Sequence, residues 1–418
     1  MTVHPILAAL RKHKAGVVLI ALQIALTLAI VCNAIFIIGQ RIERVGRPTG
    51  IDESNLFIVS QQWVGAPSGE DAAGVDKLDS MLREDLAALR AMPGVTAVTP
   101  INSLPLLNSS WTGSMSLKPG NDPDKNMSLH TAFYFADEQV FPVLGLKLVA
   151  GRAFNAGDVN HQAFRDQRGP DIVIVTKAIA DKLFPGTGAV GKTVFLNGDG
   201  KPTTIVGVVE RMQIPATGTW GDSFTWYSTL VPTRLNGYFA RYAVRTRPGQ
   251  LDAAMHAVAP TLYKVDPMRV LDEDSVHSFA DVRARAYRAD IGMAVLMGAI
   301  CLILIAVTAA GIVGLTSFWV GQRRKQIGVR RALGARKVDI LRYFQTENLI
   351  IAGGGAVLGV VLAVGVNLLL MRHFEMDRLP ILYVLAGVVV VLALGQAAVF
   401  VPARRAADVP PVVATRSV

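Results

Sequence analysis

The chain contains one motif that binds nucleotides in many other proteins. Residues 186–193 read Gly-Thr-Gly-Ala-Val-Gly-Lys-Thr and match the pattern G-x-x-x-x-G-K-[ST], in which backbone amides and the lysine hold phosphate groups. That chemistry requires a strand before the glycines and a helix after them, so that the helix N-terminus points at the phosphates. Here a helix-like run, residues 177–184, comes first and a strand-like run, residues 194–198, follows. The reversed order predicts that the motif holds no nucleotide.

Other signatures of catalysis or metal binding are missing from the sequence. It has no H-E-x-x-H and no G-x-S-x-G, and both cysteines, Cys32 and Cys301, lie inside apolar runs. The histidines of the long polar region are scattered rather than paired; they are His130, His161, His256 and His277. We therefore predict no catalytic residue, no metal site and no bound cofactor in this chain, and hence no enzyme.

The composition is that of a membrane protein. Of the 418 residues, 51% are hydrophobic and 18% are charged, and the mean hydropathy is +0.38. A helix needs about 20 apolar residues to cross a bilayer. Four runs are long enough and contain no Asp, Glu, Lys, Arg or His; they are residues 15–39, 291–320, 349–371 and 379–401. The first run is too long for a signal peptide, so we expect four transmembrane helices in a 1+3 arrangement.

The basic residues gather on one side of these spans. The two tails and the loop between the second and third spans hold 14 Lys and Arg against three acids, whereas residues 40–290 hold 26 against 27. Because Lys and Arg are enriched in cytoplasmic loops, we expect both termini and this loop in the cytoplasm and the large domain outside. The net charge of +10 is then a topology signal and not a nucleic-acid footprint.

The region between the first two spans predicts a large α+β domain. Strand-like residues 56–59 and 95–100 flank an amphipathic run at 77–92, which indicates a split β-α-β unit with about residues 111–232 inserted into it. The predicted boundaries are 1–14 for a cytoplasmic amphipathic segment, 40–275 for the outer domain with two subdomains, 276–320 for a stalk helix continuous with the second span, 321–348 for a cytoplasmic loop, 372–378 for a short outer loop and 402–418 for a cytoplasmic tail.

Small and polar residues inside the spans predict helix packing. A proton- or ion-coupled transporter usually carries ionisable residues there, and these spans have none. We expect the four amides Gln23, Asn33, Asn367 and Gln396 to make hydrogen bonds between helices. Gly355 and Gly359 form a G-x-x-x-G pair, which permits close packing within or between subunits.

The loop at 321–348 has more internal order than a basic membrane anchor requires. Gly334 permits a turn, and residues 335–347 can form a short amphipathic helix along the membrane surface. We predict a protein-docking element, with Ile340 and Leu341 as apolar anchors and neighbouring arginines setting the orientation. The predicted coupling residues are Ile327, Gly328, Arg330, Arg331, Gly334, Ala335, Arg336, Ile340 and Leu341.

This order of residues resembles the FtsX-like permease family, and within it the MacB-type members. The family's loop reads approximately R-x-x-E-I-G-x-R-x-A-x-G-A-x-x-x-x-I-L, and the matching residues here are Arg323, Ile327, Gly328, Arg330, Ala332, Gly334, Ala335, Ile340 and Leu341. Gln326 stands where the family usually has glutamate, so any charge contact of that acid with a partner would differ here. Residues 141–154, 191–192 and 205–209 resemble the MacB-type periplasmic core, and residues 402–407 resemble the family's C-terminal tail.

The resemblance implies a permease subunit of a mechanotransmission-type ABC complex in a bacterial inner membrane. Such a permease pairs with a second copy or a paralogue over two cytosolic ABC ATPases, and we expect ATP and Mg to bind only to that separate partner. A membrane-fusion protein and membrane lipid are further expected partners, and nucleic acid is not. The expected activity is export of an antibiotic, a peptide or a lipid-linked molecule. Two alternatives stay open: a regulatory signal transmitter that controls an envelope enzyme, and a membrane-anchored enzyme.

Overall fold

The computed structural model describes residues 14–120, 128–166, 169–272, 274–374 and 378–408. The chain divides into two compact units, one made of residues up to Gly46 together with those from Ala289 onward, and the other of Arg47–Arg288. The predicted N-terminal segment, apart from Lys14, lies outside the described residues, as do the centre of the predicted 372–378 loop and the tail beyond residue 408.

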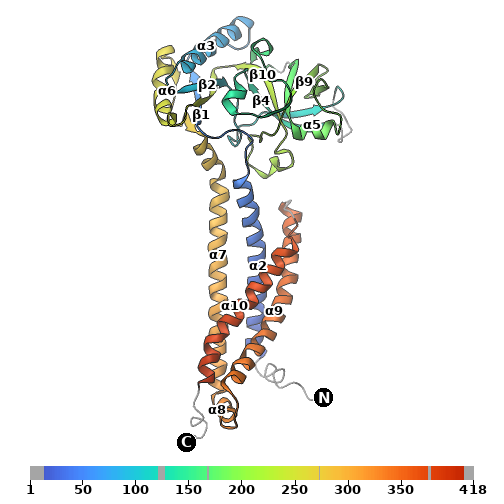
Figure 1. Ribbon diagram of the computed structural model, residues 1–418, viewed down its shortest axis with the longest axis vertical. Coiled ribbons are helices and arrows are strands. Elements are labelled where there is room, and N and C mark those ends of the chain that lie inside the picture. The colour runs from blue at the N-terminus through green and yellow to red at the C-terminus, as the bar shows by residue number, and fades with distance from the viewer. Residues whose placement is uncertain (1–13, 121–127, 167–168, 273, 375–377, 409–418) are drawn as a thin grey trace. The chain divides into compact units, whose positions relative to one another are not determined.

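Four helices of the described residues are long and apolar enough to cross a membrane. They are α2 (Lys14–Gly46), α7 (Phe279–Gln322), α9 (Lys337–Phe374) and α10 (Ile381–Ala407), labelled in Figure 1. Each coincides with one of the four apolar runs, which confirms the 1+3 arrangement. Helix α7 is continuous over 44 residues, about 66 Å at 1.5 Å per residue. The first predicted stalk residues, 276–278, form strand β13 (Val276–Ser278) instead.

Helix α9 approaches α2 closely where two glycines face it. A Cβ atom added at Gly355 would lie 2.7 Å from the Ala21 carbonyl oxygen, and one added at Gly359 would lie 3.0 Å from the Ala25 carbonyl oxygen. The missing side chains therefore let the two backbones meet. The structure places this G-x-x-x-G pair in a contact between two helices of the same chain.

Helix α7 is joined to α2 by polar contacts. The Gln23 side-chain amide donates to the Val307 carbonyl oxygen at 3.1 Å, and the hydroxyl oxygens of Thr27 and Thr308 lie 2.7 Å apart. A Cβ atom added at Gly311 would lie 2.7 Å from the Gln23 side-chain oxygen, so this amide occupies the notch that the glycine leaves.

The other three amides in the spans also bond between elements, as expected. Asn33 on α2 donates to a carbonyl oxygen of α9, Asn367 on α9 accepts from a backbone amide just before α10, and Gln396 on α10 donates to a carbonyl oxygen of α9. Their partners are Ala363 at 3.1 Å, Leu379 at 2.9 Å and Gln345 at 3.4 Å.

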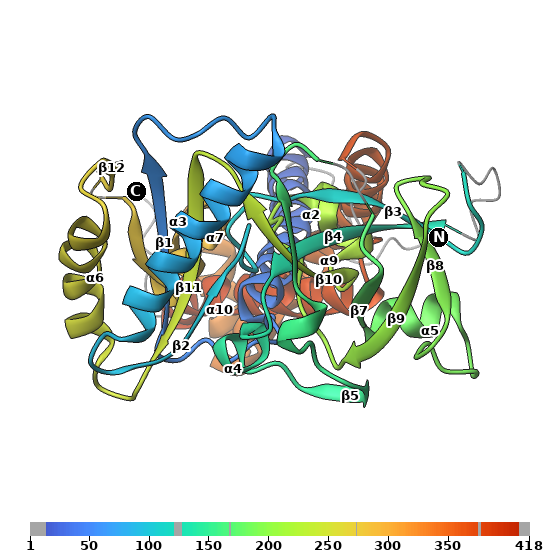
Figure 2. The ribbon, with the colours of Figure 1, turned by 90° about the horizontal axis from the view of Figure 1, so that it is seen from above.

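The first sheet of the α+β domain is antiparallel and has the order β12-β1-β11-β2, with β13 also paired to β1. Strands β1 and β2 flank β11 and are connected through helix α3, which is the split β-α-β unit indicated by the sequence. Helices α3 and α6 cover one face, where Phe57, Leu86 and Val258 share a buried core (Figure 2). The bounds are β1 Leu56–Trp63, α3 Ala72–Arg90, β2 Val95–Pro100, β11 Phe239–Thr246, α6 Leu251–Val265 and β12 Arg269–Val270.

The second sheet is mixed and takes its strands from the sequence between β2 and β11. Its order is β4-β3-β8-β9-β7-β10-β6, with β5 beside β9 and an extra pairing of β4 with β10. Helix α5 packs against β7 and β9, as Figure 2 shows. The bounds are β3 Thr112–Ser116, β4 Ser128–Ala136, α4 Val140–Leu144, β5 Leu148–Gly151, η1 Ala156–Asp158, β6 Asn160–Ala163, β7 Ile172–Thr176, α5 Lys177–Leu183, β8 Thr193–Leu196, β9 Pro202–Val209, η2 Thr219–Phe224 and β10 Ser228–Asn236.

A fully buried ion pair fixes the end of the first sheet. The two terminal nitrogens of Arg269 on β12 lie 2.8 and 2.9 Å from the carboxylate oxygens of Asp85 on α3, and both side chains are 0% exposed. The Tyr242 hydroxyl donates to the same carboxylate at 2.8 Å. These contacts tie β12, α3 and β11 together in the core.

Candidate functional site

The loop between α7 and α9 folds as a short helix, a turn and the beginning of α9. Helix α8 spans Arg324–Ala332, and Gly334 has a φ of +99°, a conformation open to glycine. Helix α9 then begins, and the Asp339 carboxylate accepts the backbone amide of Arg336 at 2.9 Å. The expected separate helix over 335–347 is therefore wrong. No Gly or Pro interrupts residues 336–352, so most of this segment continues into the spanning helix.

Of the two predicted apolar anchors of this loop, Ile340 is buried and Leu341 is partly buried. Ile340 is 4% exposed and belongs to a buried cluster with Ile327 and Phe344, and Leu341 packs against that cluster. Neither is placed to insert into a partner, so their predicted role as anchors needs correction. The exposed large apolar side chains of the loop are Val329, Leu333 and Val338, and Leu333 is 83% exposed.

A buried ion pair, not singled out from the sequence, closes the base of the loop. A terminal nitrogen of Arg323, directly after α7, lies 3.1 and 2.9 Å from the two carboxylate oxygens of Glu347 on α9. The two side chains are only 12% and 3% exposed. Because α9 packs on α2 and α10, this pair fixes the end of α7 to the helix bundle.

The predicted coupling arginines have different surroundings. The Arg330 guanidinium lies over the Tyr343 ring, 5.2 Å from its centroid. Arg331 donates to the Ala335 carbonyl oxygen at 3.2 Å and so holds the turn together. Arg336 is exposed at the start of α9, and Gly328 is buried on α8. The structure thus brings Arg330 and Arg331 against the loop itself and leaves Arg336 on the surface.

A second ion pair links the beginning of α9 to the end of α10. The Lys337 ammonium lies 2.6 Å from the Asp408 carboxylate, and it holds the pKa of that carboxyl below its ordinary value. Both side chains are more than half exposed, so this pair contributes little to stability.

Glu347→Gln is expected to destabilise the purified chain strongly. It leaves the Arg323 charge buried without a counter-charge, a change that typically costs about 3–5 kcal/mol. Thermal unfolding in detergent, followed by intrinsic fluorescence, measures the effect. Glu43→Gln, at an exposed carboxylate of α2, is the control, and the double variant Arg323→Met, Glu347→Leu should recover much of the loss. Equal unfolding temperatures for Glu347→Gln and Glu43→Gln would contradict this prediction.

The Gly-Lys-Thr motif of the outer domain lies in the structural context that its sequence predicts. Helix α5 precedes it and strand β8 follows it. The backbone amides that would hold phosphate are already bonded: Gly191 donates to the Ile205 carbonyl oxygen at 2.8 Å and Lys192 to the Ala189 carbonyl oxygen at 3.1 Å. This loop joins a helix to a strand, and the amides of Gly191 and Lys192 are used within the domain itself.

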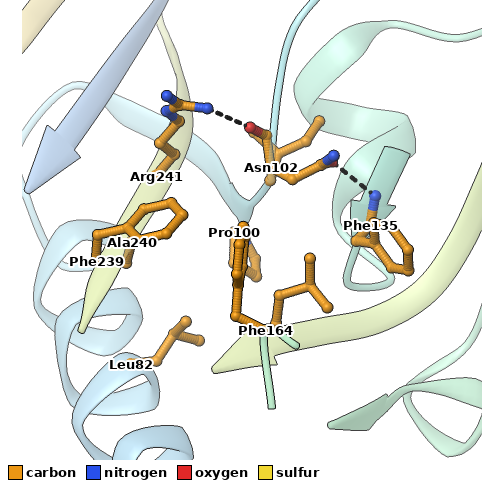
Figure 3. Close-up of a pocket in the computed structure, with 10 residues that line it drawn as sticks. Leu82, Pro100, Asn102, Phe135, Phe164, Phe239, Ala240 and Arg241 are labelled. Atoms are coloured by element: carbon orange, nitrogen blue, oxygen red, sulfur yellow. Dashed lines mark hydrogen bonds between the residues drawn. The ribbon is translucent and has the colours of Figure 1, made fainter. Parts of the chain in front are cut away.

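A small cavity lies at the seam between the two sheets of the outer domain (Figure 3). Its volume of about 20 Å³ is close to the room that one water molecule needs. Arg241 donates to the Asn102 carbonyl oxygen at 2.6 Å across its rim, and the rest of the wall is largely aromatic and aliphatic. The lining residues are Leu82, Pro100, Ile101, Asn102, Phe135, Phe164, Leu235, Phe239, Ala240 and Arg241. The cavity is a packing gap too small for an organic ligand.

The scattered histidines stay apart in the fold. Among the described residues, no three His, Cys, Asp or Glu side chains are grouped so that they could hold a metal ion. His161 contacts a neighbouring strand: its ring nitrogen lies 3.2 Å from the Asn236 side chain on β10. The loop between α7 and α9, at the base of the helices, combines a buried ion pair with exposed charged and exposed apolar side chains.

Two family sequence models match the chain. The one described as MacB-like periplasmic core domain matches residues 18–261, and the one described as FtsX-like permease C-terminal matches residues 298–411. The macrolide export ATP-binding/permease protein MacB of Neisseria meningitidis is 26% identical over 298 residues, which are 69% of this chain and 44% of that protein. The protein of the same name from Chromobacterium violaceum is 26% identical over 357 residues, 83% of this chain and 50% of that protein. The chain spans about half the length of the curated relatives it matches.

Solved structures of two outer domains are also similar. The periplasmic region of MacB from Actinobacillus actinomycetemcomitans covers 58% of this chain and 97% of its own, with 18% identity and a TM-score of 0.34. The extracellular domain of the transporter YknZ from Gram-positive bacteria covers 53% of this chain and 98% of its own, with 16% identity and a TM-score of 0.32.

Proposed function

We propose, from the premise that this chain belongs to the family of permeases with a MacB-like periplasmic core domain and an FtsX-like C-terminal domain, that it is the permease subunit of a mechanotransmission-type ABC complex. In this proposal a cytosolic ABC ATPase outside these 418 residues binds ATP and Mg. Its movement is received at the loop between α7 and α9 and drives a conformational change of the outer domain.

The observation that carries the proposal is the buried pair of Arg323 and Glu347. It attaches the end of α7 to α9 within the same loop that exposes Leu333. Since α7 is one uninterrupted helix from Phe279 to Gln322, we expect a displacement at the loop to be carried along this helix toward its N-terminal end. A rigid lever of this kind is what a partner-driven machine needs, whereas an ion-coupled transporter needs titratable groups inside its spans.

The substrate and the remaining partners are part of the same proposal. Relatives of this chain are named macrolide export proteins, so we propose a macrolide-like or other bulky apolar compound as the exported molecule. The permease would work as a dimer with a second copy or a paralogue. A membrane-fusion protein would continue the export route outside, and the complex would lie in a bacterial inner membrane.

The test is reconstitution. The tagged chain is purified from its native membranes with its bound ABC ATPase and placed in proteoliposomes, and ATP hydrolysis is measured with and without erythromycin as the probe. Stimulated hydrolysis together with ATP-dependent erythromycin transport supports export. A complex that contains the ATPase but neither transports nor responds to the macrolide favours the regulatory signal transmitter, and a chain that purifies without any ABC ATPase contradicts both.

The proposed orientation predicts which cysteines react from outside the cell. With a membrane-impermeant maleimide applied to intact spheroplasts, Asp181→Cys on α5 is expected to be labelled and Lys325→Cys on α8 to be spared. Both positions are exposed, and the native Cys32 and Cys301 are buried, so the unmodified chain is the control. The reverse labelling pattern would overturn the orientation derived from the Lys and Arg distribution.

Lys192→Ala is expected to leave ATP hydrolysis by the reconstituted complex within about twofold, since a phosphate-binding lysine would be needed for turnover. The amides of Gly191 and Lys192 are bonded to carbonyl oxygens of the domain, which supports the proposal that the lysine serves no nucleotide. Lys201→Ala, at another exposed lysine of the outer domain, is the control. Loss of nearly all activity in Lys192→Ala alone would show that the Gly-Lys-Thr motif binds nucleotide after all.

A further inference from the structure

Helix α8 and the first turns of α9 enclose a pocket of about 200 Å³. This volume is ten times that of the outer-domain cavity, which is close to the room for one water molecule. The lining residues follow i, i+3, i+4, i+7 spacing on one segment and i, i+3, i+4 spacing on the other, so each set occupies one helical face. They are Arg323, Gln326, Ile327 and Arg330, and Ile340, Tyr343 and Phe344.

The lining combines hydrogen-bond donors with an apolar floor. Two guanidinium groups, one amide and one phenol come from Arg323, Gln326, Arg330 and Tyr343. The floor is formed by Ile327, Ile340 and Phe344, each 3–5% exposed. Guanidinium groups bind phosphate oxygens with paired hydrogen bonds, and a hydroxyl and an amide add single ones.

The charges of the pocket do not cancel. Arg323 is neutralised by Glu347, but Arg330 has no carboxylate within 4 Å among the described residues and lies instead over the Tyr343 ring. Residue 326 is a glutamine, so its side chain is a neutral amide and not a carboxylate that could compensate the charge of Arg330. The pocket therefore carries one unpaired positive charge, which matches a phosphate diester whose head group has no cation of its own, with a net charge of −1, better than the nearly double charge of a phosphate monoester at pH 7.

We propose that this pocket binds the phosphate of an anionic phospholipid, with Arg330 as its main ligand. The pocket lies at the ends of two helices that are apolar enough to span the membrane, where the phosphates of one leaflet are located. Its buried apolar floor can receive the glycerol and the first acyl carbons. Basic pockets between transmembrane helices are known to hold lipid head groups. The choice of the cytoplasmic leaflet as the source of the lipid rests on the proposed orientation of the chain. Binding of the lipid does not require the ATPase.

The experiment is native mass spectrometry of the detergent-purified full chain without ATPase, titrated with dioleoyl-phosphatidylglycerol or dioleoyl-phosphatidylcholine. We expect saturable binding of phosphatidylglycerol that is at least about tenfold weaker in Arg330→Gln, because a charge-assisted hydrogen bond is lost. Gln326→Glu should weaken lipid binding similarly, since the new carboxylate can pair with Arg330 four residues on.

The control variant is Arg324→Gln, at an exposed neighbour outside the pocket lining, and it should bind lipid like the unmodified chain. Unfolding temperatures of all variants verify that the fold is intact.

Four results would overturn the proposal. Equal affinity for phosphatidylglycerol and phosphatidylcholine, which share the phosphate diester but differ in net charge, would show that the pocket does not select an anionic head group. Equal weakening by Arg330→Gln and Arg324→Gln would show a diffuse basic surface instead of a site. Displacement of the lipid by millimolar inorganic phosphate would assign the pocket to free phosphate. Absence of saturable binding would show that the pocket is not a lipid site and would favour a carboxylate of a protein partner as the group that pairs with Arg330. None of these four outcomes tests whether an ATPase docks on the loop.

Discussion

Leu333→Asp is expected to detach the ATPase from the permease while the permease stays folded. Leu333 is the most exposed apolar side chain of the loop at 83%, and it stands directly before the turn at Gly334. A small interface depends on a few such anchors, and losing one typically costs about 2 kcal/mol or more, which weakens binding about 30-fold. The affinity of the purified ATPase for the chain in nanodiscs measures this directly, and copurification of the complex should fall in parallel.

The matched comparison is Ile340→Asp, four residues into α9. Ile340 is buried beside Ile327 and Phe344, so a carboxylate there should unfold the base of the bundle and lower both yield and unfolding temperature. Leu333→Met, which keeps an apolar side chain of similar volume, should retain binding within a few fold. If Leu333→Asp binds the ATPase as tightly as the unmodified chain, the docking surface does not include this turn.

Asp85→Ala is expected to destabilise the outer domain by about 3–5 kcal/mol, because it leaves the fully buried Arg269 charge without its counter-charge. Two guanidinium contacts and the Tyr242 hydroxyl all end on this carboxylate. Since the loss is a large part of the roughly 5–15 kcal/mol that stabilises an ordinary domain, protease resistance of the outer domain in the membrane should drop sharply. Limited proteolysis against denaturant concentration provides the measurement.

Glu84→Ala is the control for Asp85→Ala, because Glu84 is the neighbouring exposed carboxylate on the same helix. Its replacement should change stability by no more than about 0.5 kcal/mol. The pair separates the cost of an unpaired buried charge from the cost of altering α3 itself. Equal protease resistance of the two variants would mean that Arg269 finds another partner or reaches water.

The spans and the split β-α-β unit were predictable because a single strong local pattern determines each of them. An apolar run of about 20 residues or more without a charge is typical of a membrane span. In the split unit, Ala72–Arg90 has the periodicity of an amphipathic helix, and the flanking strands Leu56–Trp63 and Val95–Pro100 begin with or contain short apolar and β-branched stretches. The interhelical amides followed from the same reasoning, since a polar group in hydrocarbon must find a partner on a neighbouring helix.

Strand β10 shows what local sequence does not reveal. Ser228–Asn236 contains Pro232, which argues against a strand that has neighbours on both sides. In the sheet, Pro232 is the last residue of the parallel pairing with β4, opposite Ala136, and the pairing with β6 begins at the next residue, Thr233, so the proline falls where one partner strand gives way to another. The missing amide is tolerated because of a pairing arrangement that only the assembled sheet defines.

The sequence predicted a structured loop between α7 and α9, but it did not predict which of its apolar side chains are buried. Ile340 and Leu341 are apolar residues in a charged segment, and sequence alone does not tell whether such residues face a partner or their own protein. The answer depends on α10, about 60 residues later, whose Ala403 and Ala406 share the buried cluster with Ile340. The spacing of Ile340 and Phe344, continued into the start of the third span, would have indicated the buried face.

The notch at Gly311 sets the register between α7 and α2 through one side chain. Because the Gln23 side chain sits where a Cβ atom of residue 311 would be, and because Thr27 bonds Thr308 one turn along, α7 cannot slide along α2 without moving the Gln23 amide out of this notch. A side chain at position 311 would have to displace the Gln23 amide from this notch, and we expect it to cost the hydrogen bond to the Val307 carbonyl oxygen and to shift the register of the two helices.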